Sequence, residues 1–265
     1  MGETVVAGLA HNHHPVYWCS ADRSSATAAR AHAAGAVGVS SLAAIVETCE
    51  LIISVCPPSA ALDQATTIAA QGYAGLYLDA NAVAPTTAAQ ISELFVGCYI
   101  DGGIIGPPAK TAGTTRLYLS GTIANRIPEL FAGSALDVRV LDERQNSASA
   151  LKMCYAAYTK GSIALLLATR GLAEAQGIAT ALESEWDLSQ PGLNDRVRDS
   201  ARGAAPKAWR FVDEMHEIAQ TFAASDLPND FHLGAAKTYE RLAGLKDGRG
   251  LELSSVLAEL LNSDD

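Results

Sequence analysis

Hydrophobic and polar positions follow two different patterns along this 265-residue chain, and the pattern changes near residue 143. Before this point, short apolar runs rich in β-branched and aromatic residues are separated by alanine-rich segments, as in strands that alternate with helices. After it, apolar residues recur at helical spacing almost to the end. The patterns predict an α/β domain over residues 1–143 and an all-helical domain over residues 144–265.

The first domain is expected to form a doubly wound, mostly parallel sheet of the Rossmann-like kind, with helices on both faces. Leu51–Cys56 is a nearly continuous apolar run that Pro57 ends, which is typical of a strand buried on both faces. The other predicted strands are 15–20, 37–39, 76–79, 98–104, 116–120 and 138–141. The predicted helices are 22–35, 59–70, 85–94 and one that Ser41 caps.

The chain opens with a predicted helix, Gly2 to about Asn12, that no strand precedes. A nucleotide-binding fold of this kind begins with a strand and a glycine-rich turn, which bring the helix N-terminus up to a pyrophosphate. We therefore expect that the first strand is missing and that the recorded start lies too far downstream. In the strand order 3-2-1-4-5-6 the missing strand is central, so the chain as written is expected to fold poorly or to repack.

Charge and composition narrow the possible partners. A net charge of −10 without a basic stripe disfavours nucleic acid and anionic membranes. No apolar run approaches the ~20 residues that span a bilayer, and no signal peptide is recognisable, so the expected location is the cytoplasm. The five cysteines are scattered without a CxxC pair, so neither a disulfide framework nor a metal site is expected. Small molecules are the expected partners.

Arg23 is a candidate cofactor residue because it follows the strand at 15–20, where the adenosine ribose of a dinucleotide normally lies. A guanidinium group can hold a 2′-phosphate in a bidentate way, which favours NADP. Asp22 beside it favours NAD, because an acidic residue here usually accepts a hydrogen bond from a free ribose 2′-hydroxyl. Alternatively, Asp22 caps the following helix and Arg23 is solvated.

Lys152 is the candidate catalytic residue. It lies near the start of the long helix predicted from Ser147 to about Gly177, between Leu151 and Met153. Burial among such neighbours would lower its pKa toward the range of a general acid or base. Helical spacing places Tyr155 on its face. The alternative is that Lys152 extends to solvent, and Lys160 is the competing candidate.

The sequence resembles the β-hydroxyacid dehydrogenase and 6-phosphogluconate dehydrogenase superfamily, in the branch with the C-terminal domain called DUF1932. The resemblance rests on a series of sequence landmarks that follow one another in the same order as in that superfamily. The landmarks of the first half are Gly2 with Val5, Val6 and Leu9, then Val16–Trp18, Arg23–Ser24, Val55–Pro57, Asp79–Pro85, Asp101–Gly113 and Lys152. Those of the DUF1932 branch include Ile105–Pro108, Leu117–Gly121, Tyr158–Gly161, Trp209–Phe222 and Leu227–His232.

The resemblance implies an NAD(P)-dependent dehydrogenase that transfers hydride between nicotinamide and a small hydroxyacid-like substrate. It implies that Lys152 shuttles a proton and that the helical domain forms a homodimer. NADP is the expected cofactor, with NAD possible. The implied cofactor-binding residues are Gly2, Arg23, Ser24, Val55, Pro57 and Asn81, and the implied substrate-binding residues are Ile105, Gly106, Lys110 and Tyr155.

Two departures from the family pattern leave alternatives open. Ile105 stands where the family has a substrate-binding serine, and Ala156 replaces an asparagine four residues beyond the lysine. The apolar residue at 105 suits a less polar substrate, so reduction of an imine is one alternative. The other is a degenerate, non-catalytic dimeric binding protein, because the phosphate-binding turn is absent.

Overall fold

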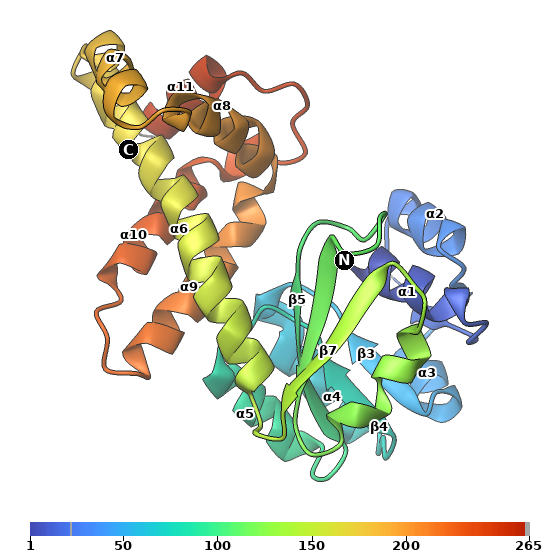
Figure 1. Cartoon of the computed structure of the whole chain (residues 1–265). Coiled ribbons are helices and arrows are strands. Elements are labelled where there is room, and N and C mark those ends of the chain that lie inside the picture. Colours follow the sequence, from blue (N-terminus) through green and yellow to red (C-terminus); the bar gives the residue numbers. More distant parts are fainter. Residues whose placement is uncertain (22, 263–265) are drawn as a thin grey trace. The chain divides into compact units, whose positions relative to one another are not determined.

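The structure is a computed structural model that describes residues 1–21 and 23–262 (Figure 1). The chain divides into two compact units, Met1–Met153 and Cys154–Asp265. Strands end at Asp142, next to the boundary predicted at 143, and the rest of the described chain is helical. The division between the compact units falls later, inside the long helix α6 (Ser147–Ala175).

Seven strands of the first unit form two sheets. A two-stranded parallel sheet contains β1 (Tyr17–Cys19) and β2 (Val37–Val39). A five-stranded sheet has the order β3-β4-β5-β6-β7, and all its neighbours are parallel except β5 and β6. Its strands are β3 (Leu51–Ser54), β4 (Leu76–Asp79), β5 (Tyr99–Ile105), β6 (Thr115–Ser120) and β7 (Leu136–Asp142). The doubly wound, mostly parallel fold predicted from the sequence is confirmed.

Alternate residues of the larger sheet pack into two separate cores, one on each face. Leu78 and Ile100 belong to one core, whereas their neighbours Tyr77 and Tyr99 belong to the other. The first core includes Val5 of α1, and the second contains residues of α3, α4 and α5. These helices are α1 (Gly2–His11), α3 (Leu42–Thr48), α4 (Ala61–Ala70) and α5 (Pro85–Leu94). The sheet is therefore covered on both faces, which allows its strands to be apolar throughout.

Serine side chains begin two of the helices. The hydroxyl of Ser41 accepts a hydrogen bond from the backbone N–H of Ala44 and so caps α3, as predicted. Ser24 caps α2 (Ser25–Ala33) in the same way by accepting from Thr27 N–H. The alternative cap, Asp22, lies outside the described residues.

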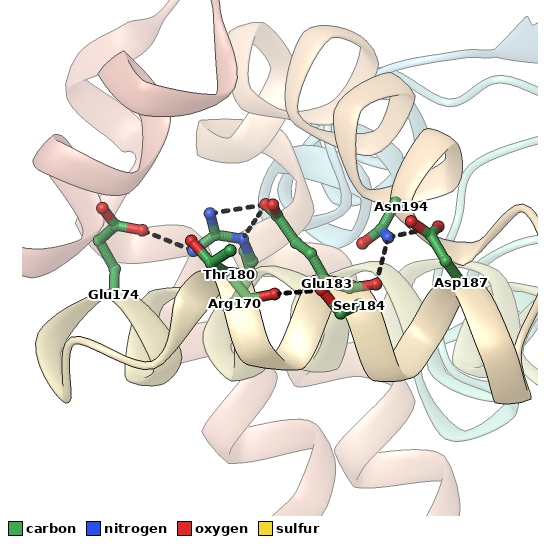
Figure 2. Close-up of polar contacts among 7 residues, drawn as sticks. All are labelled: Arg170, Glu174, Thr180, Glu183, Ser184, Asp187 and Asn194. Carbon is green, nitrogen blue, oxygen red and sulfur yellow. Dashed lines mark hydrogen bonds and ion pairs between the residues drawn. The ribbon is translucent and has the colours of Figure 1, made fainter.

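The second unit is built on α6, which continues into it from the first. The other helices are α7 (Ala179–Ser189), α8 (Leu193–Ala204), α9 (Ala208–Ala223), α10 (Asp230–Arg241) and α11 (Leu253–Leu261). Arg170 on α6 forms ion pairs with Glu174 and Glu183, and Asn194 donates to Glu183 O and Asp187 (Figure 2). These contacts hold α6, α7 and α8 together. Across the described part of the chain, no helix combines the length and hydrophobicity that a membrane span requires.

Candidate functional site

A cavity of about 1080 Å³ lies between the two sheets of the first unit. Every residue of β1 and of β3 lines it, so one edge of each sheet faces the cavity. Helix α1 contributes Val5 and Leu9, and α3 contributes Leu42 and Ile45. Among the described residues no ladder joins β1 to β3, and the cavity separates the two sheets.

Four of the six predicted cofactor residues line this cavity: Gly2, Arg23, Val55 and Pro57. They come from three segments that are distant in the sequence, namely the start of α1, the segment after β1 and the segment after β3. The fold brings them together because parallel strands carry their carboxyl ends to one edge of the sheet.

Three arginines give the cavity a cationic component, namely Arg23, Arg30 and Arg126. Arg23 also lies near enough to Cys56 to favour its thiolate, although burial is the larger effect and raises the pKa of this thiol. Glu3 and Glu50 are the acidic residues of the lining. The sequence analysis did not identify Arg30 as a cavity residue. Arg30 follows Thr27 by three positions on α2, so the two residues share one helix face, and this spacing is the signal that could have identified it.

The amino end of α1 is also part of the cavity lining. The helix begins at Gly2, and the side chain of its N-cap residue, Met1, makes no capping hydrogen bond. A β-carbon built on Gly2 would have no neighbour within 4 Å. Because N–H groups at a helix start carry partial positive charge, this end of α1 can attract an anion that enters the cavity.

Ser24 and Asn81 do not line the cavity, although the resemblance places both beside the cofactor. The hydroxyl of Ser24 caps α2. Asn81 is 3% exposed, and its amide connects the ends of two strands. Its Nδ2 donates to Ser54 Oγ at 2.9 Å, and its Oδ1 accepts from Cys56 N–H. In this structure Asn81 therefore positions the segment after β3.

Lys152 lies beside the carboxyl end of β5, on the first turns of α6. Its Nζ donates a hydrogen bond to Ile104 O at 2.8 Å. Burial lowers the pKa of Lys152 to about 8 because the charged form loses its hydration. A lysine with this pKa exchanges its proton readily near neutral pH, as a general acid or base must.

Buried polar contacts hold the start of α6 against the sheet. Asp101 on β5 accepts hydrogen bonds from Ser149 N–H and from the hydroxyls of Ser149 and Ser120. Gly103 permits the close approach, because a β-carbon there would lie 2.8 Å from Ala148 O and 3.1 Å from Lys152 Cβ. The position of Lys152 therefore depends on three elements: β5, β6 and α6.

The predicted substrate residues lie in different environments. Ile105 is the last residue of β5 and is 4% exposed, directly after the carbonyl that Lys152 contacts. Gly106 has a φ of +127°, and a side chain there would clash with Thr114 O. Lys110 is exposed. Tyr155 follows Lys152 by three residues on α6, is 46% exposed and belongs to the second unit.

Lys160, the competing candidate, forms an ion pair with Glu214 and lies over the ring of Phe211, 4.8 Å from its centroid. Both charged side chains are largely buried, which favours a fixed structural pair. No group of three or more His, Cys, Asp or Glu side chains within residues 1–21 and 23–262 is arranged to hold a metal ion.

The fold implies a nicotinamide dinucleotide, and the cavity offers part of what this group needs. The arginines and the start of α1 suit its phosphates, and Val55 and Pro57 provide an apolar wall. Gly2 is the residue that the resemblance places in the glycine-rich turn. The residues present therefore fit the phosphate groups, whereas the turn that usually surrounds them is not among these residues.

Comparisons with known proteins agree with the resemblance expected from the sequence. Residues 173–242 match the domain of unknown function DUF1932. An uncharacterised 28.5 kDa protein of Methanothermus fervidus is 28% identical over 189 residues, which are 69% of this chain and 72% of that protein.

Two solved enzymes show the same fold over nearly the whole chain. The 3-hydroxyisobutyrate dehydrogenase of Mycobacterium tuberculosis, solved with L-serine, is 18% identical with a TM-score of 0.69, covering 99% of this chain and 96% of that one. A reductive aminase of Aspergillus terreus, solved with NADPH4, cyclohexanone and allyl amine, is 18% identical with a TM-score of 0.52, covering 97% and 95%. The chain thus has the fold of nicotinamide-dependent dehydrogenases and reductases.

Proposed function

We propose that this chain, with its DUF1932 match and its 3-hydroxyisobutyrate dehydrogenase fold, is an oxidoreductase that transfers hydride between a nicotinamide dinucleotide and a small hydroxyacid-like substrate. The observation that carries the proposal is Lys152, whose burial lowers its pKa to about 8 at the carboxyl end of β5. Ligands of open α/β sheets bind outside the carboxyl ends of the strands. A lysine in this place and state suits proton transfer.

In this proposal the bound cofactor supplies the hydride chemistry, and the protein's residues manage charge and protons. Arg23, Arg30 and the start of α1 hold the phosphates, with NADP favoured because a guanidinium pairs well with a 2′-phosphate. During reduction, Lys152 gives its Nζ proton to the developing alkoxide. During oxidation the neutral amine takes the hydroxyl proton, and Ile104 O holds the amine in place.

Imine reduction is the second candidate, and the environment of Ile105 favours it. This apolar residue is buried at the end of β5, one position beyond the carbonyl that Lys152 contacts. A serine there would offer a hydrogen bond to a carboxylate, whereas isoleucine offers none. The fold is also similar to that of the Aspergillus terreus reductive aminase, which was solved with cyclohexanone and allyl amine, and this similarity supports the second candidate.

The test begins with titration of the purified chain with NADPH and NADH, followed by cofactor fluorescence. We expect NADPH to bind more tightly, and we expect Arg23→Ala to weaken NADPH binding about tenfold while leaving NADH binding nearly unchanged. Arg139→Ala is the matched control, because Arg139 is exposed and pairs with Asp137 away from the cavity lining. Absence of binding to either cofactor would favour the non-catalytic alternative.

Turnover of a small hydroxyacid and of a cyclic imine then separates the two reactions. Oxidation of the hydroxyacid with NADP⁺ supports the first candidate, whereas reduction of the imine alone supports the second. If bound cofactor reacts with neither class, the proposed activity is wrong.

The proposed enzyme is a cytoplasmic homodimer that assembles through its helical unit. Tyr158, Leu165 and Leu172 are 68%, 53% and 61% exposed on α6. Their spacing of seven residues places them on one helix face, and a second copy of the chain would cover this apolar stripe. Sedimentation is expected to show a dimer, and Leu165→Arg should yield monomers.

A further inference from the structure

We propose that Thr4 is a positioning residue for the loop 106–114, which carries the predicted substrate residue Lys110. The hydroxyl of Thr4 accepts a hydrogen bond from the backbone N–H of Ala109 at 3.1 Å and so attaches the loop to the first turn of α1 (Figure 1). The role of Lys110 rests on the proposed function, whereas the attachment of the loop does not.

The loop begins next to the site of the proposed proton transfer. It follows Ile105, the last residue of β5, and starts two residues beyond the carbonyl of Ile104 that accepts from Lys152. Lys110 lies in the middle of the loop and is exposed. The segment that leaves this site therefore carries an ammonium group that can pair with a substrate carboxylate.

Ala109 is the residue through which the loop contacts the body of the first unit. Pro108 and Lys110 on either side of it are exposed, whereas Ala109 is half-buried. It packs against the same apolar core that contains Val5 of α1. Thr4 is 5% exposed, so water competes little for its hydroxyl. A hydrogen bond and an apolar contact together fix the middle of the loop.

Other hydrogen bonds hold the shape of the loop but do not reach α1. Thr114 Oγ1 donates to Thr111 O at 2.7 Å, within the loop. Thr115 Oγ1, at the start of β6, donates to Pro107 O. These bonds would persist if the contact with Thr4 were lost, so the loop would move as a unit.

The attachment matters because Lys110 is exposed. An exposed ion pair contributes little when its partners must first be ordered. A mobile loop also loses conformational freedom when a ligand binds it, which weakens binding. The bond to Thr4 fixes the residue next to Lys110 in the free protein, so less ordering accompanies binding of the substrate.

The first test measures amide hydrogen exchange without any ligand. Thr4→Val removes the acceptor and nearly keeps the shape, so exchange at Ala109 should become about three- to tenfold faster, as for the loss of one hydrogen bond. Thr4→Ser keeps a hydroxyl and should keep the slow exchange. Thr66→Val is the matched control, because the hydroxyl of Thr66 donates to Leu62 O within α4. Exchange in β5 should not change, which separates loss of the attachment from loss of folding.

The second test measures steady-state rates with saturating NADP⁺ and 3-hydroxypropanoate, a small β-hydroxy acid. Thr4→Val and Lys110→Ala should each raise KM about three- to tenfold and leave kcat nearly unchanged. The ionisation of Lys152 near pH 8 should also remain in the pH profile of kcat. Because Thr4 acts through Lys110, the double variant should have the KM of Lys110→Ala alone.

Unchanged exchange at Ala109 in Thr4→Val would overturn the proposal, as would an unchanged KM or additive effects in the double variant. A parent protein that turns over no substrate would instead contradict the proposed function, and with it the role of Lys110. In that case exchange at Ala109 still decides whether Thr4 holds the loop. An active parent whose Thr4→Val variant behaves identically in both tests would leave the proposed function intact and remove Thr4 from it.

Discussion

Two lysines on α6, eight residues apart, show how differently a protein can use a buried amine. Lys152 contacts a backbone carbonyl, and burial lowers its pKa to about 8. Lys160 contacts the carboxylate of Glu214 and the face of Phe211. An opposite charge stabilises an ammonium group, whereas a neutral carbonyl compensates only part of the lost hydration. The first arrangement suits proton transfer, and the second suits a structural contact.

The largest expected effect is on catalysis. Lys152→Ala is expected to lower turnover by about 10²- to 10⁴-fold and to leave NADPH affinity nearly unchanged, because the proposed role is proton transfer. Steady-state rates and cofactor titration measure the two quantities separately. Lys237→Ala is the control, since Lys237 is an exposed lysine. Full turnover in Lys152→Ala would remove this residue from the proposed mechanism.

The next effect concerns stability of the second unit. Glu214→Ala removes a carboxylate that pairs with the largely buried ammonium of Lys160, so we expect a loss of about 3 to 4 kcal/mol in the free energy of unfolding. Denaturant titration measures it. Glu252→Ala, which breaks the exposed pair with Arg202, should cost at most about 1 kcal/mol. Equal losses of stability in the two variants would mean that the buried pair contributes no more than the exposed one, which would contradict the structural role of Lys160.

The charge of Lys152 is expected to lower the free energy of unfolding, whereas the Lys160–Glu214 pair raises it. The effect of Lys152 should also depend on pH. Its pKa of about 8 in the folded state is below the ordinary value of 10.5, so between these pH values the unfolded chain binds more protons. Stability should therefore rise from pH 8 to pH 10.5, by at most about 3 kcal/mol. Below pH 8 the full cost of charging the buried amine is present.

Lys152→Met tests this account, because it keeps the apolar part of the side chain and removes the charge. The variant should be more stable than the parent below pH 8, and the difference should shrink toward pH 10.5. Urea titrations at several pH values give the measurement. A difference that stays constant with pH would mean that the amine is not desolvated in the folded protein.

The smallest expected effect is on the pH dependence of turnover. Oxidation needs the neutral amine and should rise with pH through an ionisation near 8, whereas reduction needs the ammonium form and should fall. Lys160→Met should leave this ionisation in place, provided that rates are measured where the variant is folded. If Lys160→Met lost this ionisation, the transferred proton would belong to Lys160, and the assignment to Lys152 would be wrong.

Much of the fold followed from local patterns. The limits of β4 and α5, at Leu76–Asp79 and Pro85–Leu94, agree with the predicted ones, because aspartate and proline mark these boundaries plainly. The predicted start of α6 at Ser147 also agrees. The site was less predictable. Arg126 lines the cavity together with Arg23, although the two residues are far apart in the sequence.

The sequence alone determined which segments become strands and helices, because hydrophobic periodicity and capping residues act over a few neighbouring positions. It also marked Lys152 as a lysine among apolar neighbours. Tertiary structure alone decided that Lys152 contacts Ile104 and Lys160 contacts Glu214, and that Asn81 connects two strands. These outcomes depend on contacts between residues 25 to 54 positions apart, which only the folded chain brings within hydrogen-bond distance.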